Sequence, residues 1–175
     1  MAAPTIHTDR LVLRAWRDED LDAYARMCSD PEVMRYIGDG NTLSREDAWR
    51  SMAMFTGHWA LRGFGTWAVE VRDSETMVGR VGLHRPVGWP GLEVGWALDR
   101  TVWGRGYATE AARVALEHAW NELDATRVIS LINPENTRSI AVAHRLGEKF
   151  ERTIDFRGRD TRVYGIDRPA TSEPS

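Results

Sequence analysis

The spacing of hydrophobic positions changes several times along the chain, and each change marks an expected element. Apolar and polar residues alternate over 66–72, 77–84 and 92–98, which predicts three strands joined by short turns in an antiparallel meander. Helical spacing predicts helices over 18–28, 44–63 and 107–123, with a shorter helical turn at 32–37. Ser44, followed by Asp47, resembles a capping box at the start of the second helix.

The two ends of the chain complete the predicted fold. Leu11–Arg14 predicts a first strand, and the β-branched run Arg127–Ile132 predicts a buried strand parallel to 92–98, because a helix crosses between them. A helix over 137–146 ends at Gly147 and precedes a hairpin of 149–156 and 162–166. The expected fold class is α/β (α+β), with a mixed, mostly antiparallel sheet of about seven strands flanked by four helices.

Composition limits the classes of function. The chain has 175 residues, a formal net charge of −3 and a pI of about 6.0, which argues against a nucleic-acid partner. We expect a single domain over residues 1–168 and a flexible tail over 169–175, rich in Pro and Ser. Cys28 is the single cysteine, so we expect no internal disulfide and a cytoplasmic location. We expect no membrane segment and, since the histidines are scattered, no metal site.

One short stretch, Trp103 to Glu110, joins an expected strand to an expected helix. Gly104 and Gly106 allow a sharp turn, and the helix that follows offers unpaired N–H groups. Such a turn typically binds a phosphate, and Arg105 adds a second donor. A plain strand-to-helix turn that needs glycine only for its geometry is the alternative.

Four segments in this order resemble the GNAT superfamily of N-acetyltransferases, and in particular its ribosomal-protein acetyltransferase-type (RimJ/RimL-like) branch. They are T-D-R-L-V-L-R from Thr8, W-G-R-G-Y-A-T-E-A from Trp103, N-P-E-N-T-R-S from Asn133, and Leu146-Gly147. The resemblance spans Thr8 to Ile166. It implies a V-shaped splay between the two central parallel strands, acetyl-CoA as donor and a primary amine as acceptor. That amine is a protein N-terminus, an amino acid or another small amine.

The resemblance also implies where the donor binds. The pyrophosphate is expected on the backbone of the glycine turn, and the pantetheine arm in the splay between the parallel strands. Asn136 is both an expected helix cap and an expected contact for that arm. The cofactor-binding residues are therefore expected to be Trp96, Ala97, Leu98, Trp103, Gly104, Arg105, Gly106, Tyr107, Ala108, Asn133, Asn136 and Ser139.

Candidate catalytic residues follow from the needs of acetyl transfer, which are a base for the amine and a donor for the departing thiolate. Glu93 shares a strand face with small residues that fit a cleft lining, and Asp155 and His84 are the other candidate bases. Where many relatives carry a tyrosine acid, this chain has Ala143, and Ser139 is the nearest hydroxyl on that helix face.

Several alternatives stay open on the sequence alone. Ser139 has a purely structural reading in the first turn of its helix, and Glu110 is read as a first-turn acid or as a partner of Arg113. Trp59, Arg157 and Arg159 are candidate walls for the acceptor. A non-catalytic acyl-CoA-binding module is the main competing function, and a nucleotide phosphotransferase lacks the expected phosphate-binding loop. The protein is expected to be a monomer or a homodimer.

Overall fold

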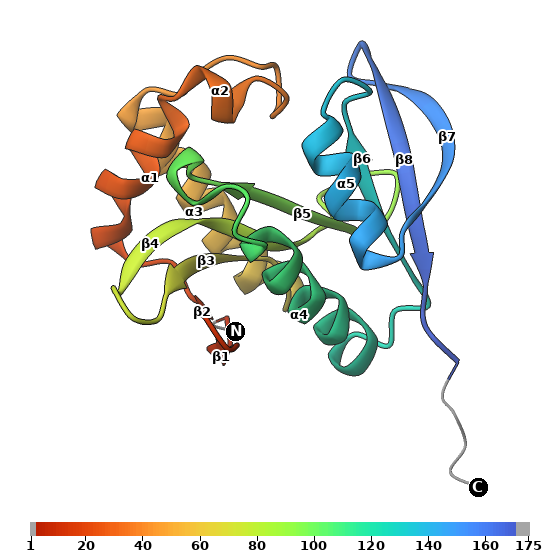
Figure 1. Cartoon of the computed structure of the whole chain (residues 1–175), viewed down its shortest axis with the longest axis horizontal. Coiled ribbons are helices and arrows are strands. Elements are labelled where there is room, and N and C mark those ends of the chain that lie inside the picture. The colour runs from red at the N-terminus through yellow and green to blue at the C-terminus, as the bar shows by residue number, and fades with distance from the viewer. Residues whose placement is uncertain (1–2, 171–175) are drawn as a thin grey trace, which may run out of the picture.

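The computed structural model describes residues 3–170, so residues 171–175 of the predicted tail lie outside it. The described chain forms one eight-stranded sheet in the order β1-β2-β3-β4-β5-β6-β8-β7 (Figure 1). Its strands are β1 Ile6–His7, β2 Leu11–Arg14, β3 Thr66–Val71, β4 Thr76–His84, β5 Glu93–Leu98, β6 Arg127–Ile132, β7 Lys149–Phe156 and β8 Arg159–Asp167. The pair β5–β6 is parallel and every other neighbouring pair is antiparallel.

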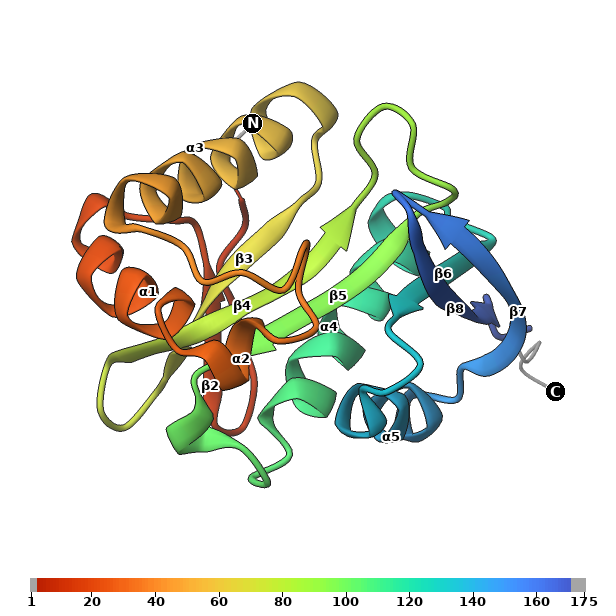
Figure 2. The same cartoon turned by 90° about the horizontal axis from the view of Figure 1, so that it is seen from above.

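Helices cover both faces of the sheet. They are α1 Leu21–Cys28, α2 Pro31–Met34, α3 Arg45–Arg62, α4 Tyr107–Glu122 and α5 Thr137–Leu146, with short 3-10 turns at Asp18–Asp20 and Arg100–Val102. Figure 2 shows α1 and α3 on one face of the β2–β5 part and α4 on the other. Small residues on α4 are fully buried, which lets its backbone lie close to the strands. No helix in the described part of the chain is both long and apolar enough to span a membrane.

The predicted class, strand pairing and parallel crossover are confirmed, with three corrections. The sheet has eight strands rather than about seven, because β1 is only two residues long and carries no periodic signal. There are five α-helices rather than four, since the turn after Pro31 counts as the short helix α2. The final hairpin turns at Arg157 and Gly158, both with positive φ, so β8 begins at Arg159 rather than at Arg162.

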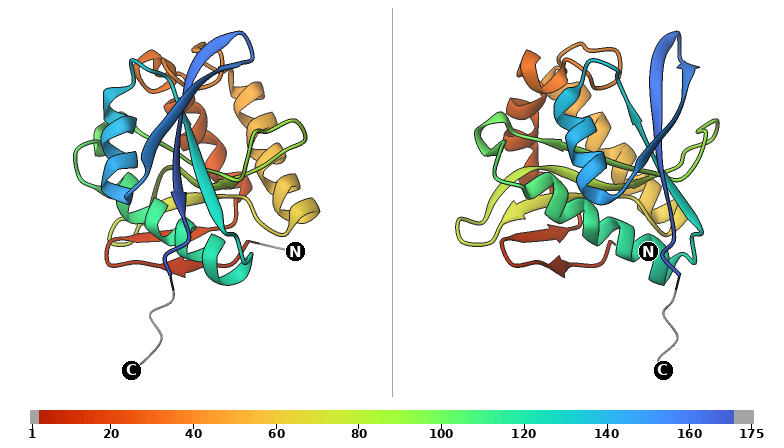
Figure 3. Two further views of the ribbon diagram at one scale, coloured as in Figure 1. Left: turned by 90° about the vertical axis from the view of Figure 1, so that its right-hand side faces the viewer. Right: turned by 45° about the vertical axis from the view of Figure 1, so that its right-hand side comes forward.

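The central feature of the sheet is the splay between β5 and β6. These strands share a single register pair, Glu93 with Ile129, and the Ile129 N–H donates to the Leu92 carbonyl at 2.8 Å. Beyond that pair the strands separate, and α5, β6, β7 and β8 form an arm that stands away from the rest of the sheet (Figure 1). Figure 3 shows the hairpin β7–β8 rising to meet the loop between α2 and α3. Arg159 Nη1 joins the two there by donating to the Gly38 carbonyl at 3.2 Å.

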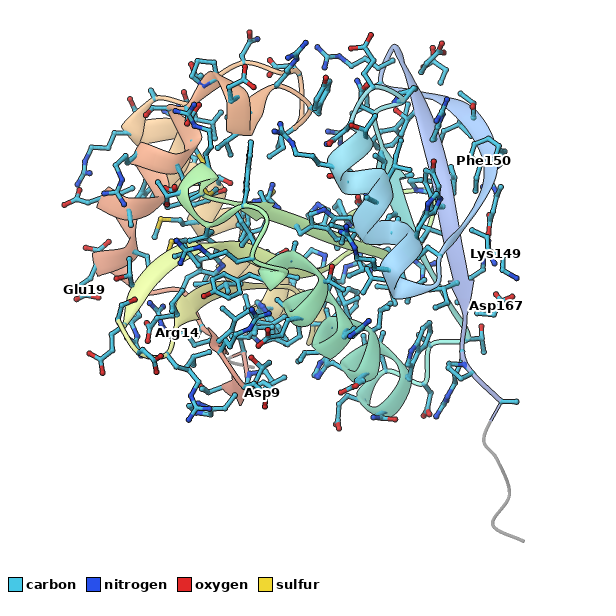
Figure 4. The ribbon with its side chains drawn as sticks, in the orientation of Figure 1. Asp9, Arg14, Glu19, Lys149, Phe150 and Asp167 are labelled. Atoms are coloured by element: carbon cyan, nitrogen blue, oxygen red, sulfur yellow. The ribbon has the colours of Figure 1, made fainter. Side chains whose placement is uncertain are left out.

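A buried ion-pair cluster fixes the N-terminal strand to the rest of the domain. The Arg14 side chain, labelled in Figure 4, is only 5% exposed and donates to both carboxylate oxygens of Asp20, at 2.7 and 2.8 Å. Its Nε donates to Glu70 on β3 at 2.7 Å. Asp20 also accepts the N–H of Arg17 at 2.8 Å, which closes the turn before α1. A charge this deep is tolerated because its partners neutralise it.

Replacing Asp20 with alanine is therefore expected to destabilise the fold by about 3–5 kcal/mol, because a buried guanidinium loses its main partner. Urea unfolding at equilibrium measures the change. Asp22→Ala is the matched control, since its ion pair with Arg45 is exposed on both sides and such pairs contribute little. Equal losses in the two variants would contradict the assignment of Asp20 to a structural ion pair.

Candidate active site

A large cleft opens where β5 ends and α4 begins. Its volume is about 990 Å³, and its lining comes from segments far apart in the chain. One end is formed by Trp103–Glu110, the middle by Trp96, Ala97 and Leu98, and the walls by residues of α2, α4 and α5. Because β5 and β6 separate here, the backbone of β5 beyond Glu93 has no strand partner on that side among the described residues.

The glycine turn has the geometry of an anion site. Gly104 and Gly106 have φ of 77° and 81°, and Gly106 is the N-cap of α4, so it has no side chain to accept the first N–H groups of the helix. A Cβ on Gly104 would meet nothing within 4 Å, which means that the turn borders open space. Exposed N–H groups and the positive end of the helix dipole both favour a bound anion at this point.

The turn is held in place by residues near the N-terminus. Glu110, in the first turn of α4, accepts hydrogen bonds from Thr8 Oγ1 at 2.6 Å and Arg10 Nε at 2.7 Å. Arg10 Nη1 also donates to the Arg105 carbonyl at 2.8 Å. The reading of Glu110 as a first-turn acid is confirmed, but its partner is Arg10 rather than Arg113. This contact brings together two of the segments on which the predicted resemblance rests, Thr8–Arg14 and Trp103–Ala111.

Positive side chains surround the same end of the cleft. Arg105 from the turn is joined by Arg113 on α4 and by Arg138 and Arg145 on α5, and none of these forms an ion pair with a carboxylate among residues 3–170. The Arg138 guanidinium lies 3.9 Å from the centre of the Trp103 ring. The last three arginines were not predicted from the sequence, although Arg138 and Arg145 are seven positions apart and so share a helix face. This end of the cleft suits a ligand with several phosphate groups.

The middle of the cleft is shaped by the start of α5. The Asn136 side chain accepts the Ser139 N–H at 3.1 Å, so the predicted helix cap is present. Ser139 Oγ accepts a hydrogen bond from Trp96 Nε1 at 3.2 Å, which leaves its own hydrogen available to the cleft. Ala143, one turn further on, is fully buried against Ile132 and Tyr164.

Glu93 begins β5 on the same sheet face as Ala97. Trp89 Nε1 donates to its Oε2 at 2.5 Å, and burial raises the pKa of Glu93 to about 7. His84, its partner on β4, stacks on His58 with ring centres 5.1 Å apart. Burial lowers the pKa of His84 to about 4, so it is a neutral ring at pH 7 and a weak base. Glu93 is thus the half-buried group on this face that changes charge near neutral pH.

A second buried acid, Glu148, escaped the sequence analysis. It is 2% exposed, and its Oε1 lies 2.9 Å from Ser130 Oγ, which itself lies 2.8 Å from the Val94 carbonyl oxygen. Ser130 has one hydroxyl hydrogen and needs it for Val94, since a carbonyl only accepts. The contacts among Oε1, Ser130 Oγ and the Val94 carbonyl are consistent when Glu148 carries a proton and donates to Ser130, while Glu148 Oε2 is buried without a hydrogen-bond partner among the described residues. Burial, with Glu93 and Glu151 nearby, raises the pKa of Glu148 to about 8, in agreement with this count.

Glu93 and His84 are not among the residues that line the cleft, and further predicted positions lie outside it as well. Asp155 is exposed in the hairpin, where its Oδ1 accepts the Gly158 N–H at 2.9 Å. Asn133 does not line the cleft, and its side chain accepts the Glu135 N–H at 2.9 Å. Trp59 is buried and packs on Trp67, so it is a core residue rather than an acceptor wall. Figure 4 shows Lys149 and Phe150 on the outer strand β7, away from the centre of the sheet.

A parallel strand pair that splays apart beside a helix start with unpaired N–H groups is a geometry suited to a long, phosphorylated ligand. Residues 10–149 match the family model of the Acetyltransferase (GNAT) domain, and the chain belongs to this family of acetyltransferases. The Bacillus subtilis (strain 168) protein YnaD, an uncharacterized N-acetyltransferase, is 31% identical over 146 residues, which cover 83% of each chain.

Solved structures of the family have the same fold. The acetyltransferase from Agrobacterium tumefaciens strain C58 matches with a TM-score of 0.85 and 27% identity over 96% of both chains. RimL, a ribosomal L7/L12 alpha-N-protein acetyltransferase in complex with coenzyme A, matches with a TM-score of 0.78 and 18% identity over 94% of this chain and 98% of its own. The RimJ/RimL-like resemblance found in the sequence is thereby supported at the level of the fold.

The hydrogen count around Ser130 predicts how stability depends on pH. Glu148 keeps its proton up to about pH 8 in the folded protein, whereas an unfolded glutamate loses it near pH 4.5. Unfolding therefore releases a proton between these two pH values, so the free energy of unfolding falls as pH rises. Glu148→Gln keeps a donor for Ser130 and removes this titration. We expect a smaller loss of melting temperature between pH 5 and about 8 in the variant than in the wild type.

The control for this experiment is Glu117→Gln, a change on the exposed face of α4 that should leave the pH dependence as in the wild type. A Glu148→Gln variant whose melting temperature falls as steeply as that of the wild type would show that Glu148 is ionised in the folded protein.

Proposed function

We propose that the protein is an acetyl-CoA-dependent N-acetyltransferase that acetylates a primary amine by direct attack within a ternary complex. One observation carries the proposal: the strand β5 connects the arginine-rich phosphate end of the cleft to a half-buried carboxylate, Glu93, that titrates near pH 7. The single cysteine, Cys28, is buried and burial raises its pKa, so it offers no thiolate for a covalent acetyl-enzyme. This favours direct transfer.

The residues of the cleft fit acetyl-CoA, which supplies a thioester-activated acetyl group when bound. The glycine turn with Arg105, Arg113, Arg138 and Arg145 would hold the phosphates. The unpaired edge of β5 at Trp96–Leu98 would hold the extended arm through backbone hydrogen bonds, because a free strand edge pairs readily with amide groups. Asn136 stands at the head of α5 and faces the same space.

In the proposed mechanism, Glu93 accepts a proton from the ammonium form of the acceptor, so that the amine nitrogen regains a lone pair. As the new N–C bond forms, the C–S bond breaks and the sulfur keeps its electron pair. The nitrogen gives up a second proton as the amide forms, and the sulfur takes up a proton. The overall change converts R–NH₃⁺ and acetyl-CoA into the acetamide, CoA–SH and one proton.

Ser139 is the proposed proton donor to the sulfur. Trp96 Nε1 occupies one lone pair of Ser139 Oγ and orients the hydroxyl, so its hydrogen is free to point into the cleft. A donor to a forming thiolate needs only to make a strong hydrogen bond, since the final proton can arrive from the amine or from water.

The competing function is an acyl-CoA-binding module without catalysis. The same cationic cleft supports it, but a Glu93 poised near neutral pH adds nothing to binding alone. An assay of CoA release over a panel of amines and N-terminal peptides separates the two, because a binding module releases no CoA. We further propose a cytoplasmic location and a monomeric or homodimeric state.

Glu93→Gln is expected to lower kcat/KM by about 10²-fold or more, because the glutamine keeps the shape of the side chain but takes up no proton. In the wild type, kcat/KM should rise with pH through about 7, as Glu93 loses its proton, and then level off. The variant should lose this rise while its acetyl-CoA affinity, measured by calorimetry, stays unchanged. Full activity in Glu93→Gln would assign the base to water or to another group.

Ser139→Ala is expected to lower kcat by about 10²-fold, the usual loss for one donor to a developing charge, with little change in the dissociation constant of acetyl-CoA. Thr137→Ala, in the same first helical turn but outside the cleft lining, controls for effects on α5. A kcat within about twofold of wild type, far short of the loss expected for such a donor, would leave Ser139 as a structural residue only.

A further inference from the structure

Arg80, on one face of the sheet, carries a positive charge that no carboxylate among the described residues neutralises. Arg80 on β4 pairs with Ala97 on β5, and alternation along the strands places its side chain on the same face as those of His84 and Glu93. Its Nε is buried without a hydrogen-bond partner, and none of the carboxylates of residues 3–170 forms an ion pair with it. The residue as a whole is partly exposed, so its guanidinium end is open to a ligand.

Arg14 offers a contrast, because its buried guanidinium has two carboxylate partners. Arg14 ends β2, the second strand from the edge of the same sheet, and is neutralised by Asp20 and Glu70. Arg80 instead lies over the Phe55 ring, with its guanidinium carbon 4.8 Å from the ring centre. A stacked aromatic ring orients a guanidinium but replaces only part of the interaction that a carboxylate would give.

The neighbours of Arg80 do not supply the missing charge. Burial raises the pKa of Tyr24 and of Cys28, so both are neutral at pH 7. His84, with its lowered pKa of about 4, is neutral as well. Glu93 is close enough for Arg80 to lower its pKa, but burial outweighs that effect and holds the pKa near 7. A half-buried cation among neutral groups costs free energy that a bound anion would recover.

We propose that Arg80 binds a carboxylate of the acceptor, so that the substrate is a primary amine carrying a carboxylate a few bonds from its nitrogen. The proposal rests on the proposed function and specifies its substrate class. A guanidinium presents two parallel N–H donors that match a carboxylate. Arg80 and His84, the partner of Glu93, are four positions apart on β4, about 13 Å between Cα atoms at the usual rise. Arg80 and Glu93 therefore lie on one face of the sheet, with Glu93 opposite His84 in the strand register.

Either a free amino acid or a peptide with an acidic first or second residue carries this chemistry. Binding is tested first, by calorimetry in the presence of saturating CoA. The affinity of each N-acetyl amino acid is compared with that of its uncharged amide. The wild type is expected to prefer the carboxylate by about 10- to 100-fold, the range for a charge-assisted hydrogen bond. Arg80→Met should lose this preference, and Arg80→Lys should keep part of it. Acidic N-acetyl peptides, compared with their Asn and Gln counterparts, form the second arm and identify the source of the carboxylate.

Two matched variants control the experiment. Arg157→Met removes another cation that acts on His84 and lies over the Trp89 ring at 4.8 Å, and Arg62→Met removes an exposed arginine at the end of α3. Both should keep the preference. Three results would each overturn the proposal. The preference for the carboxylate could persist in Arg80→Met, it could be lost in Arg157→Met alone, or the wild type could bind charged and uncharged ligands equally. Selective binding without CoA release from any acidic amine would overturn the proposed function and leave the role of Arg80 intact.

Discussion

The site depends on one constraint, which is that two parallel strands are paired at one end only. The pair Glu93–Ile129 holds β5 and β6 together, and the strands part beyond it. Parting leaves backbone groups without partners, and buried groups of this kind must be satisfied in another way. The Val94 carbonyl is satisfied by Ser130, and Ser130 in turn fixes the protonation of Glu148. The edge of β5 nearer the cleft stays available to a ligand. The separation of β5 and β6 therefore creates the binding slot. It also determines the protonation of Glu148, near the point where the two strands are still paired.

Basic and acidic side chains lie at opposite ends of β5. Arginines gather at the end that begins α4, where a ligand brings its own negative charge and water screens the excess. Near the start of β5, beyond the residues that line the cleft, burial holds Glu93 and Glu148 close to neutrality. Two ionised carboxylates so near each other would repel. Keeping at least one of them protonated avoids that cost. A carboxyl group kept near its titration point is a useful proton acceptor, whereas one kept protonated serves as a fixed donor within the framework.

The sequence predicts what depends on local pattern and misses what depends on packing. The strand alternation, the helix caps at Ser44 and Asn136, and the parallel crossover follow from residue spacing and are all present. Strand β1 and the turn at Arg157 are too short for any periodic signal. Glu148 was passed over because a charged residue after a helix C-cap normally faces water, and only the folded arm buries it. Arg80 looks like an ordinary polar position in an alternating strand until the absence of a partner among the described residues is seen in three dimensions.

The contact between Arg159 and the loop at Gly38 lies apart from β5 and the glycine turn, so the two regions can vary independently. It joins the β7–β8 hairpin to the α2–α3 loop through one long exposed side chain and backbone carbonyls, and it shares no residue with β5 or with the glycine turn. Loops tolerate changes in length and sequence far better than the elements that they connect. Under the proposed function, insertions or substitutions there would alter the surroundings of the acceptor without changing β5 or the glycine turn. The fold thus offers a route to divergence, and to engineering, in which the range of acceptors changes and the reaction does not.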